Sequence, residues 1–60
     1  MIPQDPVMLL SFINMKLRDE YGSLDALAEG LDISSDEMEA IVIKLRDLGY
    51  EYKPEFNKFA

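Results

Sequence analysis

The side chains of this sequence that could do chemistry are carboxylates, amines and hydroxyls, since the chain contains no His and no Cys. Nucleophile systems that pair Ser or Cys with His are therefore excluded, and a zinc site would lack its thiolate and imidazole ligands. The adjacent carboxylates of Asp19 and Glu20 show no sign of a pocket and fit the solvated end of a helix. The sequence predicts that the protein is not an enzyme and binds no cofactor.

Oxygen ligands at a calcium-binding spacing occur in one short stretch. Asp32, Ser34 and Asp36 alternate as at the start of an EF-hand loop, which also needs Gly at its sixth position and Glu at its twelfth. This chain has Glu37 and Ile43 there. A glycine-rich phosphate-binding motif is also absent, so we expect no metal or nucleotide site.

The charge balance argues against polyanions as partners. Six Lys and Arg stand against twelve Asp and Glu, which gives a net charge of −6. Between residues 23 and 49, Lys44 and Arg46 stand against seven acids. Because nucleic-acid binding depends on cations that displace counterions from phosphates, this acidity disfavours nucleic acid and anionic lipid as partners.

Size and composition indicate one small domain over residues 1–60. A chain of 60 residues buries only about 60% of its unfolded surface and is marginally stable alone, although 48% of its residues are apolar. We find no signal peptide and no apolar run near the ~18 residues of a membrane span. We therefore expect a cytoplasmic protein that does not contact membranes.

Helical periodicity begins close to the first residue. Asp5 can cap a helix that Pro6 opens, where the missing N–H of proline costs nothing. We expect this first helix to run from Pro6 to about Glu20. Its spacing predicts a buried face of Leu10, Ile13, Leu17 and Tyr21.

The first helix also has more apolar surface than one buried stripe needs, from Val7, Met8, Leu9, Phe12 and Met15. Two interpretations fit this excess. In one, the helix lies in the middle of the fold and buries several faces. In the other, part of Met8, Leu9, Phe12 and Met15 forms a dimer contact. Both can hold together.

A second, shorter helix should follow. Gly22 suits a left-handed cap at the end of the first helix, and Ser23 can cap a helix over residues 24–29 that Gly30 ends. Ile33 should enter the core after the turn. The inward side chains of this helix are expected to be Leu24, Leu27, Ala28 and Leu31.

The third helix begins at a capping box, in which Ser34 bonds to the amide of Glu37 and Glu37 reaches back. Acids near this end also complement the helix dipole, and Gly49 ends the helix. Its three- and four-residue spacing predicts an inward face of Met38, Ile41, Val42, Leu45 and Leu48.

The last residues predict a two-stranded hairpin. Residues 50–52 alternate with the period of a strand, Pro54 suits the second position of a turn, and residues 58–60 can return as a second strand. A hairpin this short is marginal alone and must pack on the helices, which we expect through Tyr50, Tyr52, Phe56 and Phe59.

These motifs carry two resemblances. The patterns L-D-A-L-A-E-G-L-D-I-S and L-R-D-L-G-Y-E-Y, within residues 23–60, resemble winged helix-turn-helix domains such as the N-terminal domain of the biotin repressor. This implies a mainly α fold, a three-helix winged helix-turn-helix-like domain with a short C-terminal β-hairpin. The whole chain, above all M-I-P-Q-D-P-V-M-L-L-S-F-I-N-M-K-L-R-D at residues 1–19, resembles a family of small bacterial proteins catalogued as domain of unknown function 4250, which implies no particular activity.

The winged helix-turn-helix resemblance implies one function, DNA binding as a homodimer. The side chains available for DNA contacts are Ser35 and Lys44 in the third helix, Lys53 in the wing and Arg18 in the first helix. The acids of the third helix oppose this function, so we keep it as the alternative.

A protein-interaction or homodimerisation module is the function that we favour. Ile43 should lie on the outward side of the third helix, near Ala40 and Asp47, where an exposed apolar side chain among acids suits a protein partner better than a phosphate backbone. The candidate surface, for a protein partner or a second copy of the chain, comprises Met8, Phe12, Met15, Ala40 and Ile43.

Overall fold

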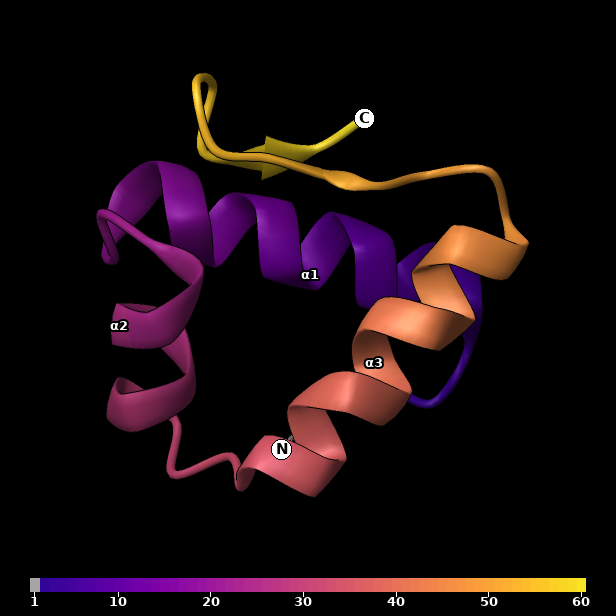
Figure 1. Cartoon of the computed structure of the whole chain (residues 1–60), viewed down its shortest axis with the longest axis horizontal. Helices are drawn as coiled ribbons and strands as arrows, with labels where there is room; N and C mark the ends of the chain where they lie inside the picture. Colours follow the sequence, from indigo (N-terminus) through magenta and orange to yellow (C-terminus); the bar gives the residue numbers. More distant parts are fainter. Residues whose placement is uncertain (1) are drawn as a thin grey trace.

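Three helices and a short antiparallel hairpin make up the fold in the computed structural model, which describes residues 2–60. The elements are α1 (Pro6–Asp19), α2 (Leu24–Gly30), α3 (Ser35–Asp47), β1 (Tyr52–Lys53) and β2 (Lys58–Phe59). The hairpin runs along one side of α1, while α2 and α3 lie on its other side (Figure 1). The first helix is therefore the central element, as one interpretation of its excess apolar surface predicts.

Each helix begins at the capping side chain that the sequence identifies. The side chains of Asp5 and Ser23 each accept a hydrogen bond from the backbone amide three residues further on, at 3.1 Å. At α3, the Ser34 amide donates to the Glu37 carboxylate at 3.0 Å, and the Glu37 amide donates to the Ser34 hydroxyl at 3.2 Å. These bonds satisfy amides that the first turn of a helix leaves without partners, and the predicted capping box is confirmed.

The capping box makes the stability of the fold depend on pH. The hydrogen bond from the Ser34 amide lowers the pKa of Glu37 below its ordinary value of 4.5. Ionised Glu37 therefore contributes stability that is fully present above pH 4.5 and is lost as the pH falls through the folded-state pKa. We expect Glu37→Gln to flatten the fall of the urea denaturation midpoint between about pH 5 and pH 3. An acid profile as steep as that of the wild type would contradict this role of Glu37.

The core forms where α1 meets the other elements. In α1 it is Leu9, rather than the expected Leu10, that begins the buried stripe, because residues 9, 13 and 17 recur at four-residue steps and stay on one side of the helix. Leu10 and Tyr21 are partly buried against the edge of this core. The buried apolar side chains of the described residues are Leu9, Ile13, Leu17, Leu27, Ile33, Ile41, Leu45 and Phe59.

Left-handed backbone is absent from Gly22, where the sequence predicts it, and occurs at other turns of residues 2–60. Gly49 has a φ of 95° and follows α3 as predicted, but Gly22 and Gly30 do not have positive φ. The turn after α2 instead uses Asp32, with a φ of 57°, because a short polar side chain tolerates this region. Gly30 is the last residue of α2, and a Cβ atom there would collide with the ring of Tyr21. The small size of Gly30 therefore leaves room for the Tyr21 ring.

The hairpin forms with a register that pairs Tyr52 with Phe59 and Lys53 with Lys58. The rings of Tyr52 and Phe59 lie 5.6 Å apart, centroid to centroid. Pro54 occupies the second position of the turn, as expected, and the bond that closes this turn is accepted by the Lys53 carbonyl at 3.0 Å. The predicted second strand is therefore present.

The first strand starts later than predicted, and the apolar packing around it differs. The Tyr50 amide donates to the Leu45 carbonyl at 3.0 Å, which uses Tyr50 to finish α3 rather than to start the strand. Phe56 lies in the hairpin turn and is 68% exposed. Leu48, beyond the last helical residue, is also exposed rather than buried. Of the aromatic side chains expected to anchor the hairpin, Phe59 is the buried one.

Two asparagine side chains fasten the hairpin to α1. The side-chain amide of Asn14 bonds to both backbone groups of Phe59, as a neighbouring strand would. Its Nδ2 donates to the Phe59 carbonyl at 3.0 Å, and its Oδ1 accepts from the Phe59 amide at 2.8 Å. Both backbone groups of Phe59 on that side are thereby satisfied in a partly buried position. Since a hairpin this short is marginal alone, these bonds help to hold it in place.

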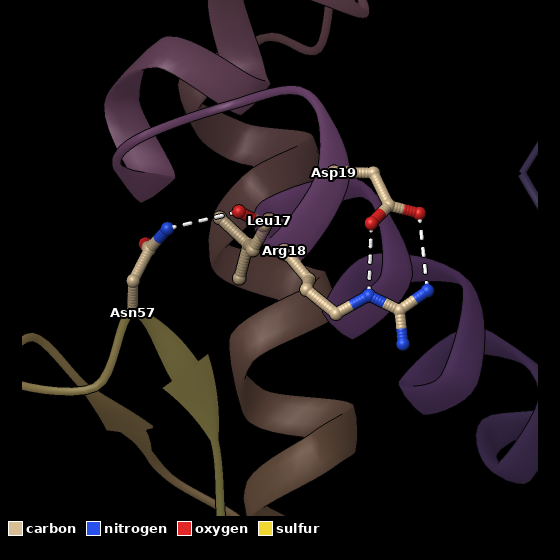
Figure 2. A network of polar contacts seen from close by, with 4 residues as sticks. All are labelled: Leu17, Arg18, Asp19 and Asn57. Carbon is tan, nitrogen blue, oxygen red and sulfur yellow. Dashed lines mark hydrogen bonds and ion pairs between the residues drawn. The ribbon is translucent and has the colours of Figure 1, made fainter.

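Asn57 makes the second attachment, at the end of the hairpin turn. Its Nδ2 donates to the carbonyls of Leu17 at 3.1 Å and Tyr21 at 2.9 Å, and its Oδ1 accepts from the Tyr52 hydroxyl at 2.7 Å. Figure 2 shows the Asn57 amide directed at the Leu17 carbonyl. Asn57 also has a φ of 52°, a conformation that Asn tolerates better than most residues. One side chain thus joins the turn, β1 and the C-terminal end of α1.

Candidate functional site

The charge of the protein is divided unevenly along the chain. Residues 21–43 carry six carboxylates and no Lys or Arg, whereas the rest of the chain carries six charges of each sign. The net charge of −6 therefore belongs to α2, the turn after it and the first part of α3, on the side of α1 opposite the hairpin (Figure 1). The six carboxylates are those of Asp25, Glu29, Asp32, Asp36, Glu37 and Glu39.

A second surface is apolar and lies on α1. Val7 and Met8 are 62% and 61% exposed, and Met15 is 43% exposed. Ser11 is exposed between them. We refer to Val7, Met8, Ser11 and Met15 as the outer face of α1, because the helical period turns these residues away from the buried stripe. Single exposed apolar residues are common, whereas several on one helix face form the kind of patch that interfaces use.

Phe12 borders this outer face rather than forming its centre. Its ring packs partly against the core, and the Lys16 ammonium lies 5.7 Å from the ring centroid. Lys16 is also 2.6 Å from the Glu20 carboxylate, and this hydrogen bond raises the pKa of Lys16. Of the candidate residues on α1, Met8 and Met15 are therefore the more accessible.

The other candidate surface lies on α3 and has a different character. Ile43 is 47% exposed, and Ala40 is exposed one turn earlier. The helical period places Asp36, Glu39 and Asp47 on the same outward side, and all three are exposed. The exposed Arg46 follows Ile43 by three residues on this side, so Ala40 and Ile43 lie among three acids and one base, apart in sequence and chemistry from the outer face of α1.

Arg18, a candidate for DNA contact, is engaged by its neighbour. Its Nε and Nη2 atoms donate to the Asp19 carboxylate at 2.8 and 3.1 Å (Figure 2). This fork-like hydrogen bonding raises the pKa of Arg18 and lowers the pKa of Asp19. The Asp19 carboxylate therefore competes with a phosphate for the Nε and Nη2 donors of Arg18.

The remaining candidates for DNA contact do not gather around Arg18. The Lys44 ammonium lies 3.5 Å from the carbonyl of Gln4, just before α1, whereas Arg18 is in the last turn of that helix. At about 1.5 Å of rise per residue, the two ends of α1 are roughly 20 Å apart. Lys53 lies in the hairpin within an ion pair at 3.8 Å. Ser35 opens α3 beside the acids, so these four residues form no continuous basic patch.

One hollow of the surface lies between the segment before α1 and α3. The pocket between the N-terminal segment and α3 has a volume of about 240 Å³ and contains two charged side chains, Glu37 and Lys44. Glu37 is already committed to its helix cap. Within residues 2–60, no group of three or more His, Cys, Asp or Glu side chains is placed to hold a metal ion. No helix in this part of the chain has the length and apolarity to cross a membrane.

Three helices, with a hairpin bonded to the first of them, define a small, mainly α protein in which the apolar outer face of α1 lies apart from the acids of α2 and α3. The chain belongs to the DUF4250 family, a domain of unknown function whose family model matches residues 3–59. The resemblance of the whole chain to this family is thereby confirmed. No curated protein and no solved structure matches the chain.

Proposed function

We propose that this protein is a non-enzymatic interaction module that forms homodimers on a helix-turn-helix scaffold with an acidic surface. The observation that supports the proposal is the separation of its two surfaces. Exposed apolar side chains gather on the outer face of α1, while the unbalanced negative charge lies on α2 and α3. A contact through α1 buries apolar surface and keeps the acids of two copies away from each other.

The winged helix-turn-helix scaffold belongs to this proposal. In it, α2 and α3 are the two helices of the motif, the turn around Asp32 joins them, and the hairpin is the wing. The order of the elements supports this assignment. The acidic residues at the start of α3 suit a scaffold that meets proteins rather than phosphates. In this role, the face around Ala40 and Ile43 would receive a protein partner with apolar and cationic groups.

Residue-resolved NMR spectra over a dilution series test the homodimer. We expect the amide resonances of Met8 and Met15 to shift as the protein is diluted from millimolar to micromolar concentration, because a contact through α1 is lost. The resonances of Glu39 and Ile43 should stay constant and serve as internal controls. Spectra that do not change with concentration would contradict homodimerisation, and shifts confined to α3 would place the contact on the wrong helix.

DNA binding by a homodimeric regulator is the second candidate function, and the helix-turn-helix order of the elements favours it. Fluorescence anisotropy of a labelled duplex at low salt tests it, since electrostatic attraction is strongest there. We expect no binding, because residues 21–43 would repel the phosphates. Binding that fades as salt rises, and that Lys44→Ala and Lys53→Ala weaken, would instead support the DNA-binding function.

A further inference from the structure

We infer that two copies of this chain pair in antiparallel orientation through the outer face of α1. This inference rests on the proposed homodimerisation and specifies its geometry. The exposed residues Met8, Ser11, Met15 and Arg18 follow one another at alternating steps of three and four, which is the spacing of a helix-pairing seam. The buried stripe of Leu9, Ile13 and Leu17 occupies the opposite side of the same helix, so the seam is available to a second helix.

The seam is complementary to itself only when the second helix runs the other way. It begins with the acidic Asp5, the N-cap residue just before α1, continues along α1 through Met8, the small Ser11 and Met15, and ends with the basic Arg18. A two-fold axis between Ser11 and Phe12 sets Met8 opposite Met15 of the second copy and Asp5 opposite its Arg18. An isologous dimer requires a surface that matches itself in this way. A parallel pair would instead place Asp5 against Asp5 and Arg18 against Arg18.

Both charged ends of the seam have an atom left over for such a contact. Asp5 uses Oδ2 to cap the Met8 amide, and among residues 2–60 its Oδ1 accepts no hydrogen bond. Arg18 uses Nε and Nη2 on Asp19 (Figure 2), while within the described part of the chain Nη1 makes no hydrogen bond. The antiparallel pair brings these two atoms together at each end and sets the small Ser11 opposite Phe12 of the second copy at the centre.

The occupant of this seam is a second copy rather than another class of protein, because α1 and its N-cap residue Asp5 together supply the acidic, apolar, small, apolar and basic groups. The exposed face of α3 does not offer this self-match, since Asp36, Glu39 and Asp47 surround Ile43. A single pair of helices of this length buries less than the roughly 800 Å² per partner of a standard interface. We therefore expect a weak dimer, with a dissociation constant of about 10 μM to 1 mM.

Disulfide trapping tests the geometry of the pair. Because the chain contains no cysteine, only the introduced cysteines can react. One sample mixes isotope-labelled Met8→Cys protein with unlabelled Met15→Cys protein, and two further samples contain each variant alone. A disulfide needs Cα atoms within about 7 Å, so its rate of formation reports direct juxtaposition. We expect the mixed disulfide to form at least fivefold faster than either self-disulfide, as read by mass spectrometry. Ile43→Cys alone, at a similarly exposed position, should form its self-disulfide no faster than Met8→Cys or Met15→Cys alone.

The outcomes separate this inference from the function on which it rests. Fast self-disulfides with a slow mixed product would mean a parallel pair and would overturn the antiparallel geometry. Fast trapping at Ile43→Cys alone would overturn the choice of α1. If the wild-type protein stays monomeric at millimolar concentration in sedimentation, and no variant traps faster than the others, homodimerisation itself fails. Circular dichroism of each reduced variant confirms that the fold is intact before oxidation.

Discussion

Replacement of Asn57 by Ala is expected to lower the free energy of unfolding by about 2–4 kcal/mol. The change removes two donated hydrogen bonds, to the Leu17 and Tyr21 carbonyls, and one accepted from the Tyr52 hydroxyl. It also puts a Cβ-bearing residue without a polar side chain at a φ of 52°, which adds strain. A domain of this size has only about 3–9 kcal/mol of stability, so this loss would leave much of the protein unfolded.

Matched variants divide the effect of Asn57 into its parts. Asn57→Gly keeps the left-handed backbone but removes all three hydrogen bonds, whereas Asn57→Asp keeps the acceptor for Tyr52 and removes both donors. Tyr52→Phe removes one bond alone and should cost about 1 kcal/mol. Urea denaturation followed by circular dichroism gives the four values. If Asn57→Ala costs less than about 0.5 kcal/mol, as ordinary surface substitutions do, the hairpin is not held by this side chain.

Replacement of Met8 by Glu is expected to raise the dissociation constant of the homodimer at least tenfold. Each tenfold change corresponds to about 1.4 kcal/mol, and a dimer contains the substituted residue twice, each time opposite a methionine. Burying a carboxylate in that apolar contact without a partner is costly. Because Met8 is 61% exposed in the single chain, the substitution should leave the circular dichroism spectrum and the unfolding midpoint close to those of the wild type.

Ile43→Glu provides the matched control. It makes the same change of chemistry at an apolar residue of similar exposure, but on the acidic face of α3. We expect it to leave the homodimer unaffected and to weaken only a contact with another protein. Equal loss of self-association in both variants would indicate a general effect of added negative charge rather than a contact through α1.

The parts of the fold that the sequence predicts are those decided by neighbouring residues. The caps at Asp5 and Ser23, the box of Ser34 and Glu37, and the glycine after α3 all act within a few positions of the chain, where side-chain chemistry is decisive. The turn at Pro54 is of the same kind. Helix number, order and approximate bounds follow from these signals, and so does the presence of a hairpin.

The parts that the sequence does not predict depend on distant partners. Asn14 and Phe59 are 45 positions apart, and nothing near Asn14 indicates that its amide continues a strand. Asn57 looks like a turn residue, which it is, but its bonds to the end of α1 span as many as 40 positions. Leu9 and Leu10 are equally apolar neighbours, so the elements that pack on α1 decide which of the two is fully buried. Phe56 and Phe59 differ for the same reason.

The candidate surfaces also differ in how far neighbouring residues alone predict them. The outward position of Ile43 can be read from the helical period of α3, and its exposure agrees with that expectation. On α1 the sequence shows an excess of apolar side chains without deciding which are exposed. The structure buries Leu9, half-buries Phe12 and leaves Met8 and Met15 in the open. The seam with Ser11 at its centre becomes visible only once that sorting is known.

Sedimentation equilibrium of the wild-type protein over a wide range of concentrations tests homodimerisation most directly. We expect the average mass to rise from the 6.9 kDa of one chain towards twice that value as the concentration approaches millimolar. In Met8→Glu the same rise should need concentrations at least tenfold higher. A mass that stays at one chain throughout, in the wild type as in the variant, would contradict the account.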